Sequence, residues 1–300
     1  MKKLIYTWMV LASILAVSCS ENDVTPDLKD VTTPFLPAAN DQSEEAQMRR
    51  QFYQDYGAFL LFNDTLQHEA LGTDVNGDLH YFNELLDLNY TVGMSTASNE
   101  KFRFTLMTDL EQKQNAVKYI EDYLLPHLTA KMMPWSWLLV DQIHRDYIGV
   151  QTSPYAVTGQ RAVVIACNVL PRLSDAQNEQ YTAQVMNAII SKLAGDNADA
   201  FGEFYQVSMA LYDGNFPAPK TEKENMALLN EVGFICRGKN YLNNEVNGLY
   251  PNQDLDMKAF ARLVVANSEE KLQQQYADYP MVLTKCEIMR RILKSLGYVE

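Results

Sequence analysis

The start of the chain decides which residues are available to fold. Lys2 and Lys3 give it a positive beginning, and residues 4–17 form an apolar run of the length found in secretory signal peptides. That run is too short to cross a membrane comfortably as a helix. The sequence therefore predicts that residues 1–18 are a removable signal peptide and that the fold lies downstream of them.

A cysteine stands at the expected cleavage point. Residues 15–19 read Leu-Ala-Val-Ser-Cys, which resembles a lipobox, the motif whose cysteine is acylated before the chain is cut in front of it. Ala16 holds the position that is usually leucine in this motif, and ordinary cleavage after Ser18 is the alternative. We expect Cys19 to be the lipid-bearing first residue of the mature chain, because several acyl chains on one residue attach a protein durably to a membrane.

The next segment, residues 19–42, has the composition of a tether. Residues 20–23 read Ser-Glu-Asn-Asp, an acidic patch that resembles the signal for export to the outer face of the Gram-negative outer membrane. Residues 24–42 are polar and contain three prolines, so they bury too little apolar surface to order themselves. We expect a disordered lipidated tether and a location at the outer membrane, exposed on the cell surface.

The composition limits the partners of the remaining chain. The 300 residues carry a formal net charge of −13, and removal of Lys2 and Lys3 with the signal peptide moves it to −15. Nucleic acid is therefore an unsuitable partner, because contacts with phosphates require a basic surface. Residues 43–300 are enough for a single large domain. Its cysteines allow at most one disulfide: Cys167, Cys236 and Cys286.

The pattern of apolar and turn residues predicts an α+β fold, with a small sheet in a mixed N-terminal part and mainly helices after residue 174. The expected elements in chain order are a helix at 43–56 ending at Gly57, a strand at 58–62, a hairpin turn at 74–78, a strand at 102–106, a helix from 108 or 109 to 125, strands at 135–143 and 162–169, a capping box at Ser174 and Gln177, and a last helix at 285–296.

No complete catalytic or metal-binding motif is present in the sequence. The histidines have no partners at metal-ligand spacing: His68, His80, His127 and His144. His68 and Glu69 begin like a zinc motif, but Gly72 stands where the second histidine would be required. Phosphate loops, dinucleotide fingerprints and serine-hydrolase elbows are also missing from the sequence.

Three stretches of the domain nevertheless resemble a known family. They are residues 48–57 (MRRQFYQDYG), residues 123–126 (YLLP) leading to 137–140 (WLLV), and the helix 181–193 followed by 204–208 (FYQVS). Together they resemble the substrate import-associated zinc metallohydrolase lipoproteins, which are surface lipoproteins associated with TonB-dependent nutrient importers and their glycan- or peptide-binding partners. The resemblance implies one zincin-like domain over residues 43–300, acting beside a TonB-dependent transporter and its surface binding lipoprotein.

The same resemblance implies that the metal site is degenerate. Asn187 and Ser191 fall where the family has its zinc histidines, and Ala188 falls where it has the catalytic glutamate. Arg262 lies near an acidic position of the family, where a positive charge would repel a cation. One face of the helix is an apolar stripe at helical spacing: Tyr181, Val185, Ile189 and Leu193. We therefore expect a core helix with no zinc, no cofactor and no catalytic residues, a pseudo-enzyme.

These features favour a non-catalytic binding or accessory lipoprotein of a glycan or peptide import system. One alternative is a glycosidase or peptidase whose acid pair is assembled by folding. Two carboxyl groups about 5 to 9.5 Å apart would favour glycosidase chemistry. The other alternative is a structural subunit of a surface complex.

Overall fold

Local signals place the first helix where the sequence predicts it. In the computed structural model α2 spans Glu44–Tyr56, the Ser43 side chain accepts a hydrogen bond from the Ala46 amide, and Gly57 ends the helix with a φ of +67°. That left-handed conformation favours glycine. The structure describes residues 33–86, 88, 100–240 and 244–300.

The compact unit of the described chain begins at Pro34. Phe35, which the sequence analysis places in the tether, is 6% exposed, and its ring centre lies 5.2 Å from that of Phe59. The Arg49 guanidinium donates hydrogen bonds to the carbonyls of Phe35 and Leu60, and so ties this segment to the first strand. Residues 1–32, with the predicted signal peptide and Cys19, lie outside the described residues. Across the described ranges, no helix has the length and apolar character needed to cross a membrane.

A four-stranded mixed sheet with the strand order β1-β5-β9-β8 forms the centre of the N-terminal part. β1 (Phe59–Leu61), β5 (Ser136–Val140) and β9 (Val163–Ala166) are parallel, and β8 (Ala156–Thr158) is an antiparallel edge strand. Every residue of the three parallel strands is buried, as is usual for parallel strands that are covered on both faces. The predicted strands at 58–62 and 162–169 are therefore present in shorter form.

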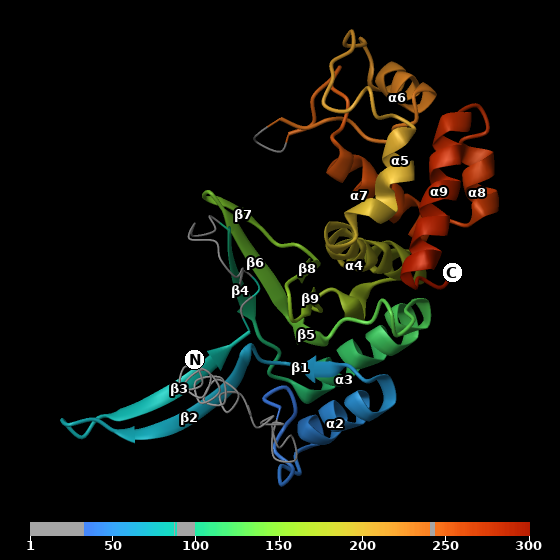
Figure 1. Ribbon diagram of the computed structural model, residues 1–300. Helices are drawn as coiled ribbons and strands as arrows, with labels where there is room; N and C mark the ends of the chain where they lie inside the picture. The colour runs from blue at the N-terminus through green and yellow to red at the C-terminus, as the bar shows by residue number, and fades with distance from the viewer. Residues whose placement is uncertain (1–32, 87, 89–99, 241–243) are drawn as a thin grey trace, which may run out of the picture. The chain divides into compact units, whose positions relative to one another are not determined.

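Side chains of this sheet alternate between two hydrophobic clusters. On one face Leu60, Trp137 and Ile165 join the larger cluster, which also contains the helices. On the other face Leu138 and Val164 join a smaller cluster with residues from the neighbouring three-stranded sheet. Each strand is thus in contact with a core on both sides (Figure 1).

The structure has two strands, β5 and β6, where the sequence predicts one at 135–143. The Asp141 amide donates to the Thr105 carbonyl, so the chain leaves β5 and enters a second sheet as β6 (Gln142–Tyr147). There it pairs antiparallel with β4 (Glu100–Thr105), the strand predicted at 102–106. The short strand β7 (Val150–Thr152) completes this sheet, and neither it nor β8 is predicted from the sequence.

A two-stranded ribbon forms around the predicted hairpin turn. β2 (Thr65–Thr73) and β3 (Leu79–Leu85) pair with each other and with no other strand of the described chain. In the turn, the Asp74 carboxylate accepts hydrogen bonds from the amides of Asn76 and Asp78. The ribbon carries several large apolar side chains that are exposed: Leu71, Val75, Leu79, Tyr81, Phe82 and Leu85.

Helices dominate after residue 174, as predicted, and the coarse α+β class is confirmed. The helices are α3 (Leu110–Tyr119), which continues as a π-helix at Ile120–Leu124 and a 3-10 turn at Leu125–His127, then α4 (Asp175–Asp196), α5 (Gly202–Gln206), α6 (Glu222–Glu231), α7 (Gln253–Val265), α8 (Glu269–Gln275) and α9 (Pro280–Leu296). The last helix starts earlier than the predicted 285, because Pro280 suits a first helical turn.

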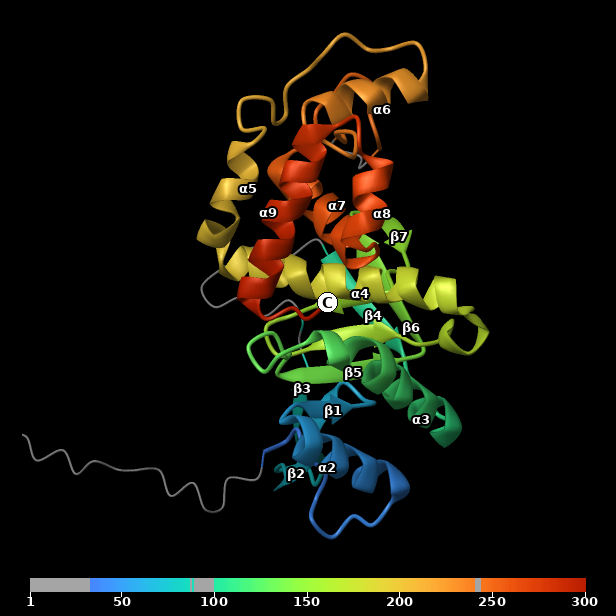
Figure 2. The ribbon, with the colours of Figure 1, turned by 90° about the vertical axis from the view of Figure 1, so that its right-hand side faces the viewer.

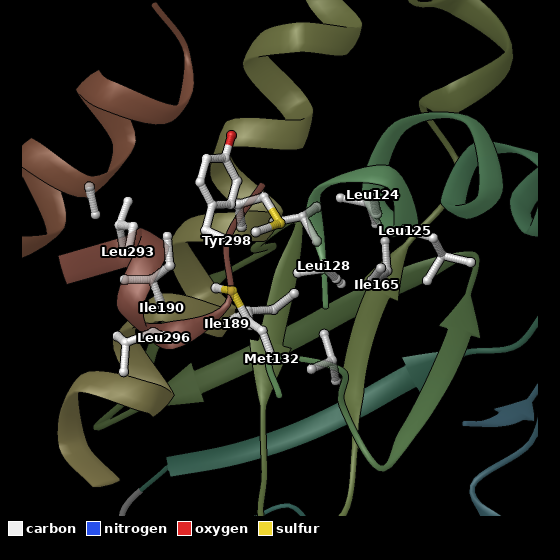
Figure 3. Close-up of a cluster of buried hydrophobic side chains, with 14 of the residues drawn as sticks. Leu124, Leu125, Leu128, Met132, Ile165, Ile189, Ile190, Leu293, Leu296 and Tyr298 are labelled. Atoms are coloured by element: carbon white, nitrogen blue, oxygen red, sulfur yellow. The ribbon is translucent and has the colours of Figure 1, made fainter. Parts of the chain in front are cut away.

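Helix α4 lies between the mixed sheet and the C-terminal helices (Figure 2), and it contacts β8 and α7 most extensively. Its start matches the predicted capping box, since the Gln177 side chain accepts from the Ser174 amide at 2.9 Å. Tyr181, Val185 and Ile189 are buried as the stripe predicts, and Leu193 is partly buried. Helix α4 also packs against α9. Figure 3 shows side chains of the two helices in one hydrophobic cluster: Ile189 and Ile190 from α4, and Leu293 and Leu296 from α9.

A buried ion pair joins α7 to α9. Asp256 and Lys285 are both 0% exposed, and Lys285 Nζ donates to Asp256 Oδ2. The Tyr212 hydroxyl donates to the same oxygen at 2.6 Å. Three ring centres lie 4.4, 4.8 and 4.7 Å from Lys285 Nζ: those of Phe204, Phe234 and Phe260. Burial raises the pKa of Asp256 and lowers the pKa of Lys285, and the partner's charge opposes each shift.

We expect Asp256→Ala to lower the free energy of unfolding by about 3–5 kcal/mol, because it leaves the Lys285 charge buried without its partner. Lys258→Ala, on the same helix, removes an exposed pair with Asp254 and should change that free energy by less than about 0.5 kcal/mol. Urea unfolding measures both. Equal losses in the two variants would show that burial of the charge is not what makes the pair important.

Candidate functional site

The three residues that the sequence resemblance assigns to a degenerate metal site lie together on one partly buried face of α4. Asn187 and Ser191 are one helical turn apart, and Ala188 is beside them. The Ser191 hydroxyl donates to the Asn187 backbone carbonyl at 2.6 Å, so its hydrogen is used within the helix. Asn187 Oδ1 is buried and has no hydrogen-bond partner among the described residues. The face therefore presents one amide, one engaged hydroxyl and a methyl group.

These groups do not fit the zinc ion that the family resemblance implies. A zinc hydrolase needs three protein ligands, usually histidine or carboxylate, and a carboxylate that accepts a proton from the bound water. Ala188 has no polar side-chain atom, and the oxygens of Asn187 and Ser191 are neutral donors that suit harder ions. Arg262 is exposed on α7, and its positively charged side chain is not a zinc ligand. Within the described ranges, no group of three or more His, Cys, Asp or Glu residues is placed to hold a metal.

Each histidine has a nearby polar partner, and that of His127 is in the C-terminal segment. His68 contacts Asn83 and stacks on Tyr81, His80 Nε2 lies 3.5 Å from Asp74 Oδ2, His127 Nδ1 lies 2.8 Å from the Val299 carbonyl oxygen, and His144 Nε2 lies 2.9 Å from Thr105 Oγ1. Two of these residues are in the β2–β3 ribbon, one is in the 3-10 turn and one is in β6. These contacts account for the imidazoles as local structural groups.

The described cysteines are free thiols, and their surroundings explain them as packing residues. Cys167 and Cys286 are buried, and Cys236 is partly buried. Burial raises the pKa of Cys236 and of Cys286 to about 12. A thiol with such a pKa stays protonated near neutral pH and is a poor nucleophile.

The Asp256–Lys285 pair is the chemically richest cluster that the sequence reading missed. Asp256 lies on α7, and its carboxylate faces Lys285 inside the core. The sequence carries one signal for this pair, because Lys285 stands between Val282 and Met289 on the buried side of α9. Both charged groups are fully enclosed, so their role is to position helices.

A cavity of about 630 Å³ lies beside the first half of α4. It is lined by Glu179 and Thr182 of α4, Tyr123, His127, residues 264–271 from the end of α7 to the first turn of α8, Arg290 of α9, Tyr298 and Glu300. Its volume is typical of small-ligand sites, roughly 300–1,000 Å³. Thr182 precedes Asn187 by five residues, which is about 140° around the helix at about 100° per residue. The cavity therefore lies on a different face of α4 from the degenerate metal positions.

A second cavity of about 390 Å³ adjoins the first. The two share Glu269, Arg290 and Glu300 as lining residues. Arg290 Nη1 donates to Glu300 Oε1 at 2.9 Å, and Nη2 donates to the Asn267 carbonyl at 2.6 Å. Arg290, held by these two hydrogen bonds, therefore lines both cavities.

Two ionisable side chains that line the first cavity have shifted pKa values. Hydrogen bonds from its own amide and from the Ser268 hydroxyl lower the pKa of Glu270, so this side chain is a carboxylate at neutral pH. Burial, together with the charge of Glu300, raises the pKa of Tyr298 to about 12, so its hydroxyl keeps the proton. The cavity thus offers carboxylate acceptors and hydroxyl donors side by side.

Comparison with known proteins gives no relative from which a role for these residues could be taken. No family model, no curated protein and no solved structure matches the chain.

We expect the protein to purify without stoichiometric zinc, because Asn187, Ala188 and Ser191 supply no zinc ligand of ordinary strength. Elemental analysis measures the metal content, and thermal melts with and without EDTA should give the same Tm. One zinc per chain, lost together with stability on chelation, would contradict this expectation and redirect attention to the histidines.

Proposed function

We propose that this chain is a lipid-anchored protein of the outer-membrane surface that binds a glycan or peptide for a nutrient import system without hydrolysing it. The observation that carries the proposal is α4, which is packed as a core helix and offers only Asn187, Ala188 and Ser191 at the positions that the family resemblance assigns to zinc ligands and base. The mixed sheet beside this long helix supports a zincin-like scaffold. Binding is then the activity that such a scaffold can still perform.

The N-terminal sequence supports the location. Cys19 follows a signal peptide, and the acidic patch at 20–23 resembles a surface-export signal. A lipid at Cys19 and a tether of some length would keep the domain near the membrane and near a TonB-dependent transporter with its surface binding lipoprotein. The net charge of −13 agrees with a partner other than nucleic acid.

Two observations favour the alternative functions. The cavity beside α4 gathers Glu179, Glu270 and Glu300 from separate segments, which supports a hydrolase with an acid pair assembled by folding. The exposed apolar side chains of the β2–β3 ribbon support a structural subunit of a surface complex. Product analysis after incubation with oligosaccharides or peptides distinguishes a hydrolase from a binding protein. Co-purification of partner proteins in mild detergent distinguishes a structural subunit from a binding protein.

We expect cells fed radiolabelled palmitate to label the wild-type protein and not the Cys19→Ala variant, because the thiol is the site of acylation. The label should be accompanied by recovery in the membrane fraction, and protease added to intact cells should degrade the protein. Cys236→Ala is the matched control, since it removes a different, partly buried thiol and should leave the label intact. Labelling of Cys19→Ala, or wild-type protein free of membranes, would refute the anchor.

A further inference from the structure

We propose that the cavity beside α4 binds a neutral oligosaccharide. This inference deepens the proposed function and rests on it, because it selects a glycan over a peptide as the ligand. It concerns the 630 Å³ cavity, called here the Glu179 cavity, and the adjoining 390 Å³ cavity behind Arg290.

The hydrogen-bonding groups of the Glu179 cavity match a ligand rich in hydroxyl groups. A sugar hydroxyl both donates and accepts, so it can donate to the Glu179 or Glu270 carboxylate and accept from a tyrosine hydroxyl. Figure 3 shows the Tyr298 side chain with its hydroxyl pointing away from the hydrophobic cluster against which its ring packs. Because that hydroxyl keeps its proton, it is a donor at neutral pH.

The cavity is lined by four glutamates against Lys271 and Arg290, and this partly compensated acidic lining favours a neutral ligand over an anionic one. Glu300 is paired with Arg290. Glu269 and Glu270 are in the first turn of α8, where the positive end of the helix stabilises carboxylates, and Lys271 follows them. These acids would repel an anionic ligand. A cationic ligand would have to compete with Arg290 for Glu300 and with the α8 terminus for Glu269 and Glu270.

Aromatic rings give the cavity surfaces suited to the carbon–hydrogen faces of sugars. Tyr123 lines it, and one face of the Tyr123 ring stacks on Tyr119 with the ring centres 5.3 Å apart. The stack holds the ring in place and leaves its remaining surface for a ligand. Thr182 is fixed in the wall in a similar way, because its hydroxyl lies 2.9 Å from that of Tyr119. The wall is therefore organised before any ligand binds, which reduces the entropic cost of binding.

The paired cavities suit a linear chain better than a single compact molecule. They meet at the Arg290–Glu300 pair, so a ligand of about two to three sugar rings in the Glu179 cavity can extend past Arg290 into the second cavity. An extended peptide is a poorer match, because it is bound mainly by adding a strand to a sheet edge. None of the described lining residues of the Glu179 cavity lies in a named strand.

Calorimetric titration of the full chain, in a detergent without sugar head groups, tests this inference. The probes are the neutral trisaccharides maltotriose, cellotriose and mannotriose, with trigalacturonate and hexalysine as charged counterparts. We expect at least one neutral trisaccharide to bind with a millimolar or lower Kd. Glu179→Gln and Tyr123→Leu should each weaken this binding about tenfold or more, because each removes a ligand contact.

Glu231→Gln is the matched control: it makes the same isosteric change at an exposed position on α6 and should leave Kd unchanged. Circular dichroism verifies that the variants fold. The inference is overturned if no neutral trisaccharide binds, if hexalysine or trigalacturonate binds more tightly, or if both cavity variants bind as the wild type does. Palmitate labelling tests the membrane anchor separately. If the wild-type protein is labelled but binds no neutral trisaccharide, the cavity assignment is refuted and the anchor is not.

Discussion

The burial of α4 is the constraint on which the rest of this structure depends. The helix packs against β8 on one side and α7 on another, so it links the sheet to the C-terminal helices. Val185, Met186 and Ile190 are 0% exposed, and each buried side chain of this size contributes about 1.5–3 kcal/mol relative to exposure. A helix with this role is retained whether or not its remaining face carries a metal. The fold of α4 therefore does not depend on a metal at Asn187 and Ser191.

The Asp256–Lys285 pair extends the same core towards α9. Two charges in an apolar interior are costly to desolvate, and the pair persists because its geometry and the Tyr212 hydroxyl compensate for that cost. The surrounding phenylalanine rings exclude water and place their electron-rich faces near the ammonium group. The pair thus orients α7 and α9, and these two helices in turn supply the cavity with the α7–α8 connection and Arg290.

Local signals were readable from the sequence, and long-range pairings were not. The helix start near Ser43, the helix end at Gly57 and the turn at 74–78 depend on a few neighbouring residues, and each is found where it was expected. The split of 135–143 into two strands depends on the Thr105 carbonyl, which lies far away in the sequence. The cavity was missed for the same reason, because Glu179 and Arg290 come together only after the helices pack. Asn187, Ala188 and Ser191 could be compared with a zinc motif from the sequence alone, because all three stand on a single helix.

Hydrogen exchange measured amide by amide is the most direct test of the claim that α4 is a structural centre and not a metal site. The account predicts that amides between Tyr181 and Ile190 exchange as slowly as any in the chain, with an opening free energy equal to that of global unfolding. Added zinc or EDTA should leave these rates unchanged. Fast exchange along α4, or protection that arises only when zinc is present, would contradict the account.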